Sequence, residues 1–548
     1  MTRRWRGTRA GAPALAAIPL VVLAVFFVYP VLGIVGQGFV SDGRFAPGAV
    51  LEVLGRPRTG RVLWFTLWSA GLATLVTLLA GLPLAFVLHR LSFPGRGLLR
   101  ALVVVPFVLP TVVVGVAFGQ LVAPSGWLGG LHLEGTAAAI VAALVFFNVS
   151  VVVRTVGSFW ESLDPRREQA AAALGASPLQ VFGTVTLPAL LPGVVGAATV
   201  VFLFCSTAFG IVLTLGGLRY ANVETEIWLL TTQELDLTGA AALSVLQLVV
   251  ITGLLVLTHV TRKDGGHVDR ATGTARRPRR DDAWVLGWSA LVLAALALPM
   301  LALLTRSLTD QAGRWTGANY RALAGTAGGT LPVSALTALA NSLEIALVAT
   351  GFALALGVIV AGLASRRPAR ASGRRAVAVF DGVFMLPLGV SAVTLGFGYL
   401  VTLDQPPLDL RSSPWLVPIA QAMVALPLVV RTVAPVLRAV DDRQRQAAAS
   451  LGAGPLRVLL SVDLPAAWRS LLAAAGFAFA VSLGEFGATS FVVRDETPTL
   501  PVVIYRLVSH PGALNAGTAM AASVLLAATT ALVMLAVERL RVGAVGAF

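Results

Sequence analysis

The chain has 548 residues, of which 57% are hydrophobic and 12% are charged. Soluble domains carry about 25% charged residues, so this chain lacks the charge needed to cover a water-exposed surface, and its hydrophobicity also excludes intrinsic disorder. The apolar runs have the length of membrane-spanning helices, about 20 residues, which excludes the short alternating strands of a membrane β-barrel. The composition therefore predicts an all-α polytopic membrane protein.

Twelve apolar runs are long enough to cross a hydrocarbon core about 30 Å thick. They lie near residues 14–36, 62–88, 101–123, 136–157, 188–214, 238–260, 283–305, 341–364, 376–401, 414–437, 469–493 and 514–537. Arginines precede the first run, as in a signal peptide, but the apolar core of a signal peptide has only about 7–15 residues. We therefore expect an uncleaved first helix.

The basic residues indicate the orientation of these spans. The chain has 41 Lys and Arg against 26 Asp and Glu, a net charge of +15, and many of the arginines lie in alternate loops such as 261–282 and 365–375. Because basic loops remain in the cytoplasm, both termini are predicted to be cytoplasmic, and the charge gives no indication of a nucleic-acid partner. Glu224 and Glu226 lie in a predicted outer loop, where contact with an extracytoplasmic partner is one interpretation and a solvated surface is the simpler expectation.

Residues for catalysis or metal binding are not apparent in the sequence. The single cysteine, Cys205, excludes an intrachain disulfide, and the five histidines lack the spacing of metal ligands. We therefore expect no catalytic residues, no metal site and no cofactor held by this chain.

The two halves of the chain are repeats of each other at an offset of 277 residues. VVRTV at 152–156 recurs at 429–433, and the segment 169–188 recurs at 446–465. Further matches are Leu109-Pro110 with Leu386-Pro387, Phe209-Gly210 with Phe486-Gly487 and, after a one-residue gap, Gly81 with Gly357 and Arg90 with Arg366. Six predicted spans separate the copies, so both lie on the cytoplasmic side and the repeat is parallel.

The repeated loop segment predicts two short helices joined by a sharp turn. Residues 166–174 are strong helix formers, and Gly175 suits the left-handed conformation that ends a helix. Ser177-Pro178 is typical of the start of the next helix. Gly452 and Gly454-Pro455 repeat this pattern. Such a rigid exposed element favours a docking role, and the alternative is an amphipathic hairpin that packs on the bundle.

Both segments resemble the signature loop of the permease subunits of binding-protein-dependent ABC importers. That loop has Glu-Ala-Ala, then Gly, then Ile-x-Leu-Pro. The matching residues are Gln169, Ala170, Ala171, Gly175, Leu187 and Pro188 in the first copy, and Gln446, Ala447, Ala448, Gly452, Leu464 and Pro465 in the second. Gln replaces the leading Glu in both copies, and Val185 and Val462 replace Ile. The resemblance implies that these residues couple the permease to an ATPase.

The resemblance also implies the fold and the partners. It implies a type I ABC importer permease with about 12 helices in two parallel six-helix repeats, located in the bacterial inner (cytoplasmic) membrane. The partners would be two copies of a cytoplasmic ABC ATPase subunit, which holds ATP and magnesium, and an extracytoplasmic binding protein. The chain would be a translocation subunit and not an enzyme, and its sequence contains no P-loop motif G-x-x-x-x-G-K-[ST].

A fused, double-length permease resembles two groups most, the thiamine (or thiamine diphosphate) importers and the iron(III) importers. The stretches 145–156, 209–217 and 482–505 favour thiamine. An ion-coupled secondary transporter is the alternative from another class, although buried charge relays are scarce here. Glu485, in an apolar run, is a candidate to line the pathway for a cationic substrate, and an interhelical hydrogen bond is the other possibility.

The expected divisions of the chain follow the repeat and the basic loops. They are an N-terminal segment with the first helix (1–61), a first permease domain (62–260), a cytoplasmic linker (261–282), the seventh helix with an outer loop (283–340), a second permease domain (341–537) and a cytoplasmic tail (538–548).

Overall fold

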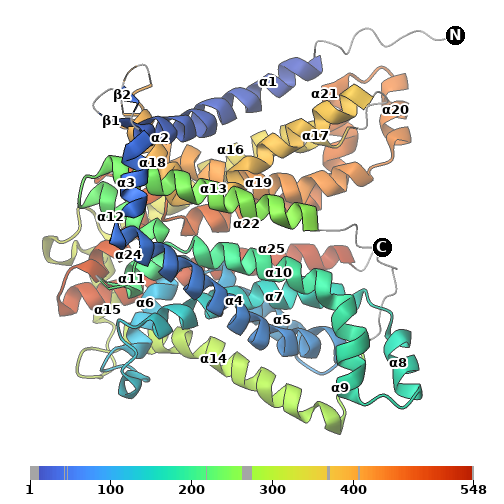
Figure 1. The fold of residues 1–548 in the computed structure, drawn as a ribbon, viewed down its shortest axis with the longest axis horizontal. Coiled ribbons are helices and arrows are strands. Elements are labelled where there is room, and N and C mark those ends of the chain that lie inside the picture. The colour runs from blue at the N-terminus through green and yellow to red at the C-terminus, as the bar shows by residue number, and fades with distance from the viewer. Residues whose placement is uncertain are drawn as a thin grey trace.

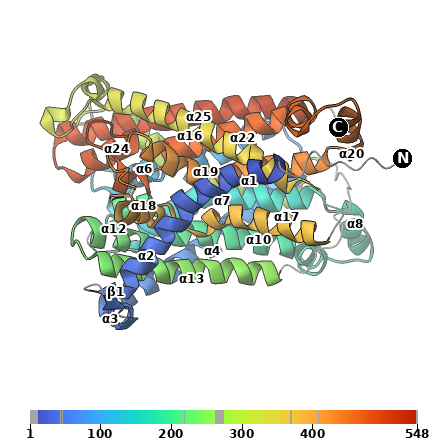
Figure 2. The ribbon, with the colours of Figure 1, turned by 90° about the horizontal axis from the view of Figure 1, so that it is seen from above.

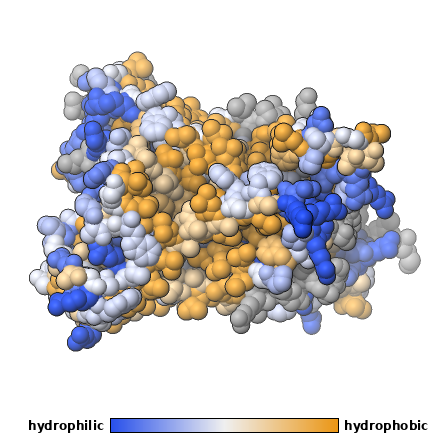
Figure 3. All heavy atoms as spheres, turned by 90° about the horizontal axis from the view of Figure 1, so that it is seen from below, coloured by the Kyte–Doolittle hydropathy of each residue, from blue (hydrophilic) through white to orange (hydrophobic). Residues whose placement is uncertain are grey.

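The computed structural model describes residues 11–41, 44–45, 47–217, 219–261, 275–366, 371–404, 406 and 408–545. Most of the long helices run along one direction and form a bundle (Figure 1 and Figure 2). Within the described ranges the only strand pair is β1 (Val40–Ser41) with β2 (Arg44–Phe45). On the face shown in Figure 3, apolar side chains form a broad band between two polar ends, as expected of a membrane protein.

Ten helices in the described part of the chain are long and apolar enough to cross a bilayer. They are Leu15–Phe39, Pro57–Arg90, Ala137–Glu161, Pro178–Ser206, Leu237–Leu254, Arg280–Ser307, Ala335–Ala364, Leu416–Ala439, Leu459–Gly484 and Ala513–Val537. The predicted all-α, multi-pass architecture is thus confirmed. The predicted linker 261–282 and tail 538–548 lie partly outside the described residues, as does the start of the N-terminal segment.

Four of the twelve predicted runs are not continuous helices, and their breaks form two pairs. The run 101–123 is divided between α5 (Arg96–Val108) and α6 (Thr111–Val122), which are bent by 99°. The run 376–401 is divided between α17 (Ala371–Met385), a 3₁₀ turn and α18 (Ala392–Thr402). Both breaks fall at the repeated pair, Leu109-Pro110 and Leu386-Pro387, because proline lacks an N–H and disfavours a helical residue before it.

A second pair of breaks also falls at equivalent positions. Helix α10 (Leu187–Ser206) ends and α11 (Gly210–Leu215) begins within the predicted run 188–214. Helix α22 (Leu464–Gly484) ends and the short α23 (Thr489–Val492) follows within the run 469–493. The helices α12 (Val223–Thr232) and α24 (Leu500–Ser509) come next in their halves. The two repeats therefore share their helix breaks as well as their sequence.

The repeat is also visible in close helix packing. A Cβ atom at Gly81 on α4 (Pro57–Arg90) would lie 2.7 Å from the side chain of Val152 on α7 (Ala137–Glu161). A Cβ atom at Gly357 on α16 (Ala335–Ala364) would lie 2.5 Å from Val429 on α19 (Leu416–Ala439). Since both contacts join equivalent residues, each glycine allows the same helix pair to approach closely.

The first helices of the two halves are exchanged. Phe27, between α1 (Gly11–Leu23) and α2 (Tyr29–Phe39), lies in a hydrophobic cluster whose other members, apart from Leu23, come from the second half. The hydroxyl of Tyr399 donates to the carbonyl of Phe26 over 2.7 Å. Conversely, Val292 on α14 (Ala283–Ser307) packs with Leu84 and other residues of the first half. The halves are thus interlocked.

Candidate functional site

The repeated loop segments form two similar projections. The first consists of α8 (Pro165–Ala173) and α9 (Pro178–Val181), and the second of α20 (Asp442–Ser450) and α21 (Pro455–Val458). Both lie at the same end of the bundle, which is also where α1 begins and where α25 (Ala513–Val545) ends (Figure 1). We refer to these two helix pairs as the first and second projections.

Each projection begins with an aspartate cap. The Asp164 carboxylate accepts a hydrogen bond from the backbone N–H of Arg166, and Asp441 accepts one from Arg443, each over 2.9 Å. Capping satisfies one of the free N–H groups at a helix start. The first helix begins at Pro165, one residue before the predicted segment 166–174, and Asp followed by Pro is a recognisable start signal.

The turn between the two short helices has the same geometry in both copies. Gly175 has φ +88° and Gly452 has φ +86°, a conformation that non-glycine residues rarely adopt. The N–H of Ala176 donates to the carbonyl of Ala171 over 3.2 Å, and that of Gly175 donates to Ala172 over 3.0 Å. These two bonds form a Schellman motif, which fixes the direction of the chain after the helix.

The first projection has an additional cap at its second helix. Ser177 and Gln180 form a capping box, in which the Ser177 N–H donates to Gln180 Oε1 over 2.8 Å and the Gln180 N–H donates to Ser177 Oγ. Pro178 occupies the first turn, as the sequence predicts. In the second projection Gly454 precedes Pro455 and has no side chain for this role.

The outer surface of the projections is unusually exposed and partly apolar. None of the residues of α8 is buried. Leu174 is 90% exposed, Leu179 79% and Leu451 89%. The predicted residues Gln169, Ala170, Gly175, Pro188, Gln446, Ala447, Gly452 and Pro465 are exposed, and Ala171, Leu187, Ala448 and Leu464 are half-buried. Exposed large apolar side chains grouped on one element are typical of a docking surface.

The repeated Leu-Pro pairs mark the point where each projection joins a long helix. The N–H of Leu187 donates to the carbonyl of Phe182, five residues earlier, and Pro188, which follows, has no N–H. Leu464 and Pro465 repeat this arrangement, with the N–H of Leu464 donating to Leu459. Each pair therefore produces a π-helical turn, η3 (Phe182–Thr186) or η8 (Leu459–Asp463), which re-aims the chain at the base of the projection.

An ion pair anchors the first projection to the bundle. Arg90, at the end of α4, donates to Glu168 on α8 over 2.6 Å and to the carbonyl of Leu163. The hydroxyl of Thr186 donates to the other oxygen of Glu168 over 2.9 Å. The side chain of Arg90 is 9% exposed and that of Glu168 is 27% exposed, so the pair is largely removed from water.

The second projection is anchored with the carboxylate on the other element. Arg445 on α20 donates to Asp463, at the start of α22, over 2.8 Å, and Arg366 lies 3.6 Å from the same carboxylate. The Asp463 side chain is only 1% exposed. Burial acts to lower the pKa of Arg445, but its hydrogen bonds to Asp463 and Asp442 outweigh that effect and raise the pKa above its ordinary value.

The two anchors occupy equivalent positions with different chemistry. Glu168 corresponds to Arg445 and Thr186 to Asp463, while an arginine, Arg90 or Arg366, is present in both. The equivalence of the two arginines was predicted from the sequence, whereas the ion pairs that they form were not. The sequence did contain a signal for these ion pairs. One aligned position has an acid in the first half and a base in the second, and another aligned position has an acid in the second half alone.

Glu485 is buried, with 7% exposure, and it caps the start of α23. Its carboxylate accepts from the N–H groups of Ala488, over 2.8 Å, and Thr489, over 3.0 Å, and from the Thr489 hydroxyl. These bonds satisfy a buried carboxylate within its own segment. A role in lining the pathway stays a prediction.

The expectation that Glu224 and Glu226 form a solvated surface is wrong. Glu224 is 0% exposed and accepts hydrogen bonds from Gln247 and, across the two halves, from Ser391 over 2.8 Å. Glu226 is 3% exposed and lies 2.5 Å from Arg58. Their helix, α12, packs between other elements, and buried carboxylates require such partners. Within the described ranges, no group of His, Cys, Asp and Glu side chains could hold a metal ion.

Several permease proteins are similar in sequence to this chain. The thiamine transport system permease protein ThiP of Brucella abortus is 28% identical over 490 residues, covering 85% of each chain. ThiP of Escherichia coli is 28% identical over 474 residues, covering 83% of this chain and 85% of the relative. The sulfate transport system permease protein CysT of Escherichia coli is 34% identical over 214 residues, covering 38% of this chain and 76% of the relative.

A bacterial ABC transporter involved in import of the acidic polysaccharide alginate provides a solved structure for comparison. It is 16% identical with a TM-score of 0.42, and the match covers 48% of this chain and 100% of that chain. The family model described as binding-protein-dependent transport system inner membrane component matches twice, at residues 78–263 and 353–541. Because these two matches cover more than half of a chain with duplicated helices, breaks and projections, the chain belongs to this family of ABC importer permeases.

Proposed function

We propose that the chain is the translocation subunit of an ATP-driven importer in the bacterial inner membrane, with both termini in the cytoplasm. Each projection docks on one of two copies of a separate ATPase subunit, and an extracytoplasmic binding protein delivers the substrate. The observation that carries this proposal is the pair of exposed projections at one end of the bundle, each with the same left-handed turn and an exposed leucine.

The construction of the projections suits the transmission of force. The Schellman turn makes each projection rigid, and the first projection has a capping box in addition. The ion-pair anchors connect α8 and α20 to the ends of long helices. A displacement of the ATPase subunits would therefore move whole helices and not only a surface loop. Such movement biases a two-state bundle between its inward-open and outward-open forms.

Thiamine, or its diphosphate, is the substrate that we propose. The support is the printed function of the ThiP relatives, which align over most of both chains. The decisive measurement is titration of the partner binding protein with thiamine and with Fe(III). Tight binding of thiamine supports the assignment, whereas binding of Fe(III) alone would transfer the system to iron import.

Docking is tested by site-specific cross-linking. Leu174→Cys and Leu451→Cys, in separate variants, should each cross-link to the ATPase subunit, because both side chains are exposed on the projections. The native Cys205 is 2% exposed and should give little background labelling. Leu131→Cys is a matched control. Leu131 is 62% exposed, but it lies in the segment before α7, and the start of α7 is at the end of that helix away from the first projection. A cross-link from the control and none from the projections would contradict the assignment.

The energy source is tested in proteoliposomes that contain the permease, the ATPase subunit and the binding protein. Uptake should require ATP and should persist when an uncoupler removes the ion gradient. Uptake that stops with the uncoupler while ATP is present would identify an ion-coupled secondary transporter.

A further inference from the structure

Four aromatic side chains from equivalent positions of the two halves meet in one cluster. Phe209 and Phe486 are 277 residues apart, as are Trp228 and Tyr505. The rings of Phe209 and Phe486 are stacked, with centroids 5.2 Å apart and an interplanar angle of 19°. Trp228 and Tyr505 meet edge to face at 5.7 Å. We call these four residues the aromatic quartet.

The four rings of the quartet form a closed cycle of contacts. Phe209 lies 6.3 Å from Trp228 within the first half, and Phe486 lies 5.5 Å from Tyr505 within the second. Each ring therefore contacts one partner in its own half and one in the other half. When equivalent residues of two repeats touch each other, they lie on the axis that relates the repeats, so any separation of the halves at this point must separate these rings.

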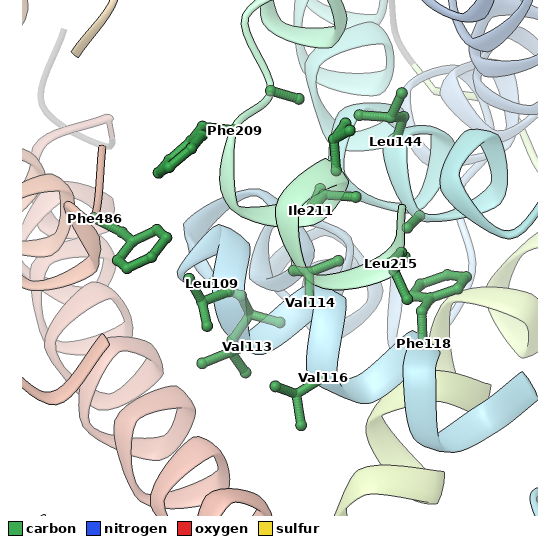
Figure 4. Packing of buried hydrophobic residues seen from close by; sticks show 14 of the residues in the cluster. Leu109, Val113, Val114, Val116, Phe118, Leu144, Phe209, Ile211, Leu215 and Phe486 are labelled. Carbon is green, nitrogen blue, oxygen red and sulfur yellow. The ribbon is translucent and has the colours of Figure 1, made fainter. Parts of the chain in front are cut away.

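The quartet lies at the breaks in the membrane helices. Phe209 directly precedes α11, and Phe486 lies between α22 and α23. Figure 4 shows the two phenylalanine rings turned toward each other near Leu109. Irregular backbone at membrane depth is tolerated where it is buried in protein or lines a cavity, and breaks at corresponding positions of two repeats indicate a substrate pathway.

The helices that carry Trp228 and Tyr505 are held in the same way in both halves. The Thr66 hydroxyl accepts from the N–H of Val223, at the start of α12, over 3.1 Å. The Ser342 hydroxyl accepts from the N–H of Leu500, at the start of α24, over 2.7 Å. Both helices lie toward the end of the bundle opposite the projections (Figure 1), so the quartet is placed away from the ATPase side.

One polar group of the quartet has no partner. Trp228 Nε1 is buried, and no hydrogen-bond acceptor contacts it within the described part of the chain. Phe209 and Phe486 are 6% and 3% exposed. A buried indole N–H normally finds a partner, so this donor is available to a ligand that enters between the rings.

We propose that the aromatic quartet is the outer gate of the translocation pathway and that its rings bind a cationic heteroaromatic substrate when they separate. Aromatic faces attract cations and stack on flat rings, and Trp228 supplies one hydrogen-bond donor. The substrate class rests on the proposed import function. The sealing role is independent of the proposed substrate, because it follows from the packing of equivalent residues between the halves.

Sealing is tested with the double variant F209A/F486A in proteoliposomes without ATP or binding protein. Removal of both rings should allow a small neutral solute to leak, while the wild type stays sealed. Phe204→Ala is the matched control, since Phe204 lies on α10 and is 36% exposed outside the quartet. An F209A/F486A variant that elutes as a monodisperse protein and does not leak would overturn the gate.

Recognition is tested with F209L/F486L, which keeps apolar bulk but removes the rings. This variant should stay sealed yet take up thiamine roughly tenfold more slowly, from the loss of cation–π contacts. Trp228→Phe should slow uptake without a leak, since an aromatic ring remains while the donor and part of the ring surface are lost. Unchanged thiamine uptake in F209L/F486L would overturn recognition by the rings. A leak from F209A/F486A in a system that transports no thiamine would leave the gate standing and reject the proposed substrate.

Discussion

The anchors beneath the projections show that the two halves keep a buried ion pair at the same place although different residues carry its charges. Arg90 and Arg366 are equivalent. Arg90 pairs with a carboxylate on α8, whereas Arg366 lies near a carboxylate on the segment that leads into α22. A buried charge is costly unless it is paired. The repeat therefore tolerates an exchange of acid and base so long as the site remains neutralised.

This view predicts that the first anchor can be converted into the second. E168R alone places a second guanidinium beside Arg90 without a carboxylate, and should lower the free energy of unfolding by about 2–3 kcal/mol. E168R/T186D recreates the arrangement of Arg445 and Asp463 and should recover most of that loss. Thermal unfolding in detergent measures both variants, and T186D alone is the control. If the double variant is no more stable than E168R, the equivalence of the anchors is wrong.

At the residue scale, the sequence predicted the turns and helix caps, which depend on adjacent residues. It did not predict the side-chain contacts between residues distant in the sequence. Gly175 and Ser177 were assigned correctly because turn and cap preferences depend on a few adjacent residues. The bond between Arg90 and Glu168 joins residues 78 positions apart. The bond between Glu224 and Ser391 joins residues 167 positions apart. No local preference specifies such pairs, so the burial of Glu224 could not be foreseen.

At the level of elements, the left-handed glycines decide the direction of each projection. G175P/G452P should destroy the turn, because proline fixes φ near −65° whereas these residues have φ +88° and +86°. We expect the protein to insert into the membrane but to lose stimulation of the ATPase by the binding protein. G175N/G452N is the matched control, since asparagine tolerates this conformation. Normal transport by G175P/G452P would reject the coupling role.

Hydropathy located the membrane segments but could not distinguish straight helices from broken ones. The run 101–123 is apolar throughout, yet it bends by 99° between α5 and α6. The information was present in the repeated Leu-Pro pair, because proline restricts the backbone independently of how apolar the segment is. A proline that recurs at one position of both halves therefore predicts a break better than a fall in hydropathy.

At the scale of the whole molecule, three sets of contacts between the described parts of the two halves bear on how the halves move. The first helices are exchanged, so that Phe27 packs in the second half and Val292 in the first. The aromatic quartet joins equivalent residues on the axis. The third connection is polar, where Glu224 accepts from Ser391. The apolar contacts can slide or part gradually, whereas the polar contact is either made or lost.

The polar contact should therefore act as a latch that favours the arrangement seen here. Glu224→Ala leaves the Gln247 amide without its acceptor and leaves the Ser391 hydroxyl with Thr394 alone, and should weaken this arrangement by about 1–3 kcal/mol. Ser391→Ala removes the same bond between the halves together with the cap of α18, where Ser391 Oγ accepts from the Thr394 N–H over 2.9 Å, and should weaken this arrangement in the same direction. Because a ligand or a mutation acts by shifting the populations of states, we expect Glu224→Ala to raise the basal ATPase rate of the assembled importer in the absence of binding protein. Low reactivity of Cys205 with a maleimide, at 2% exposure, would show that each variant is still folded. A basal rate equal to that of the wild type in a folded Glu224→Ala variant would reject the latch.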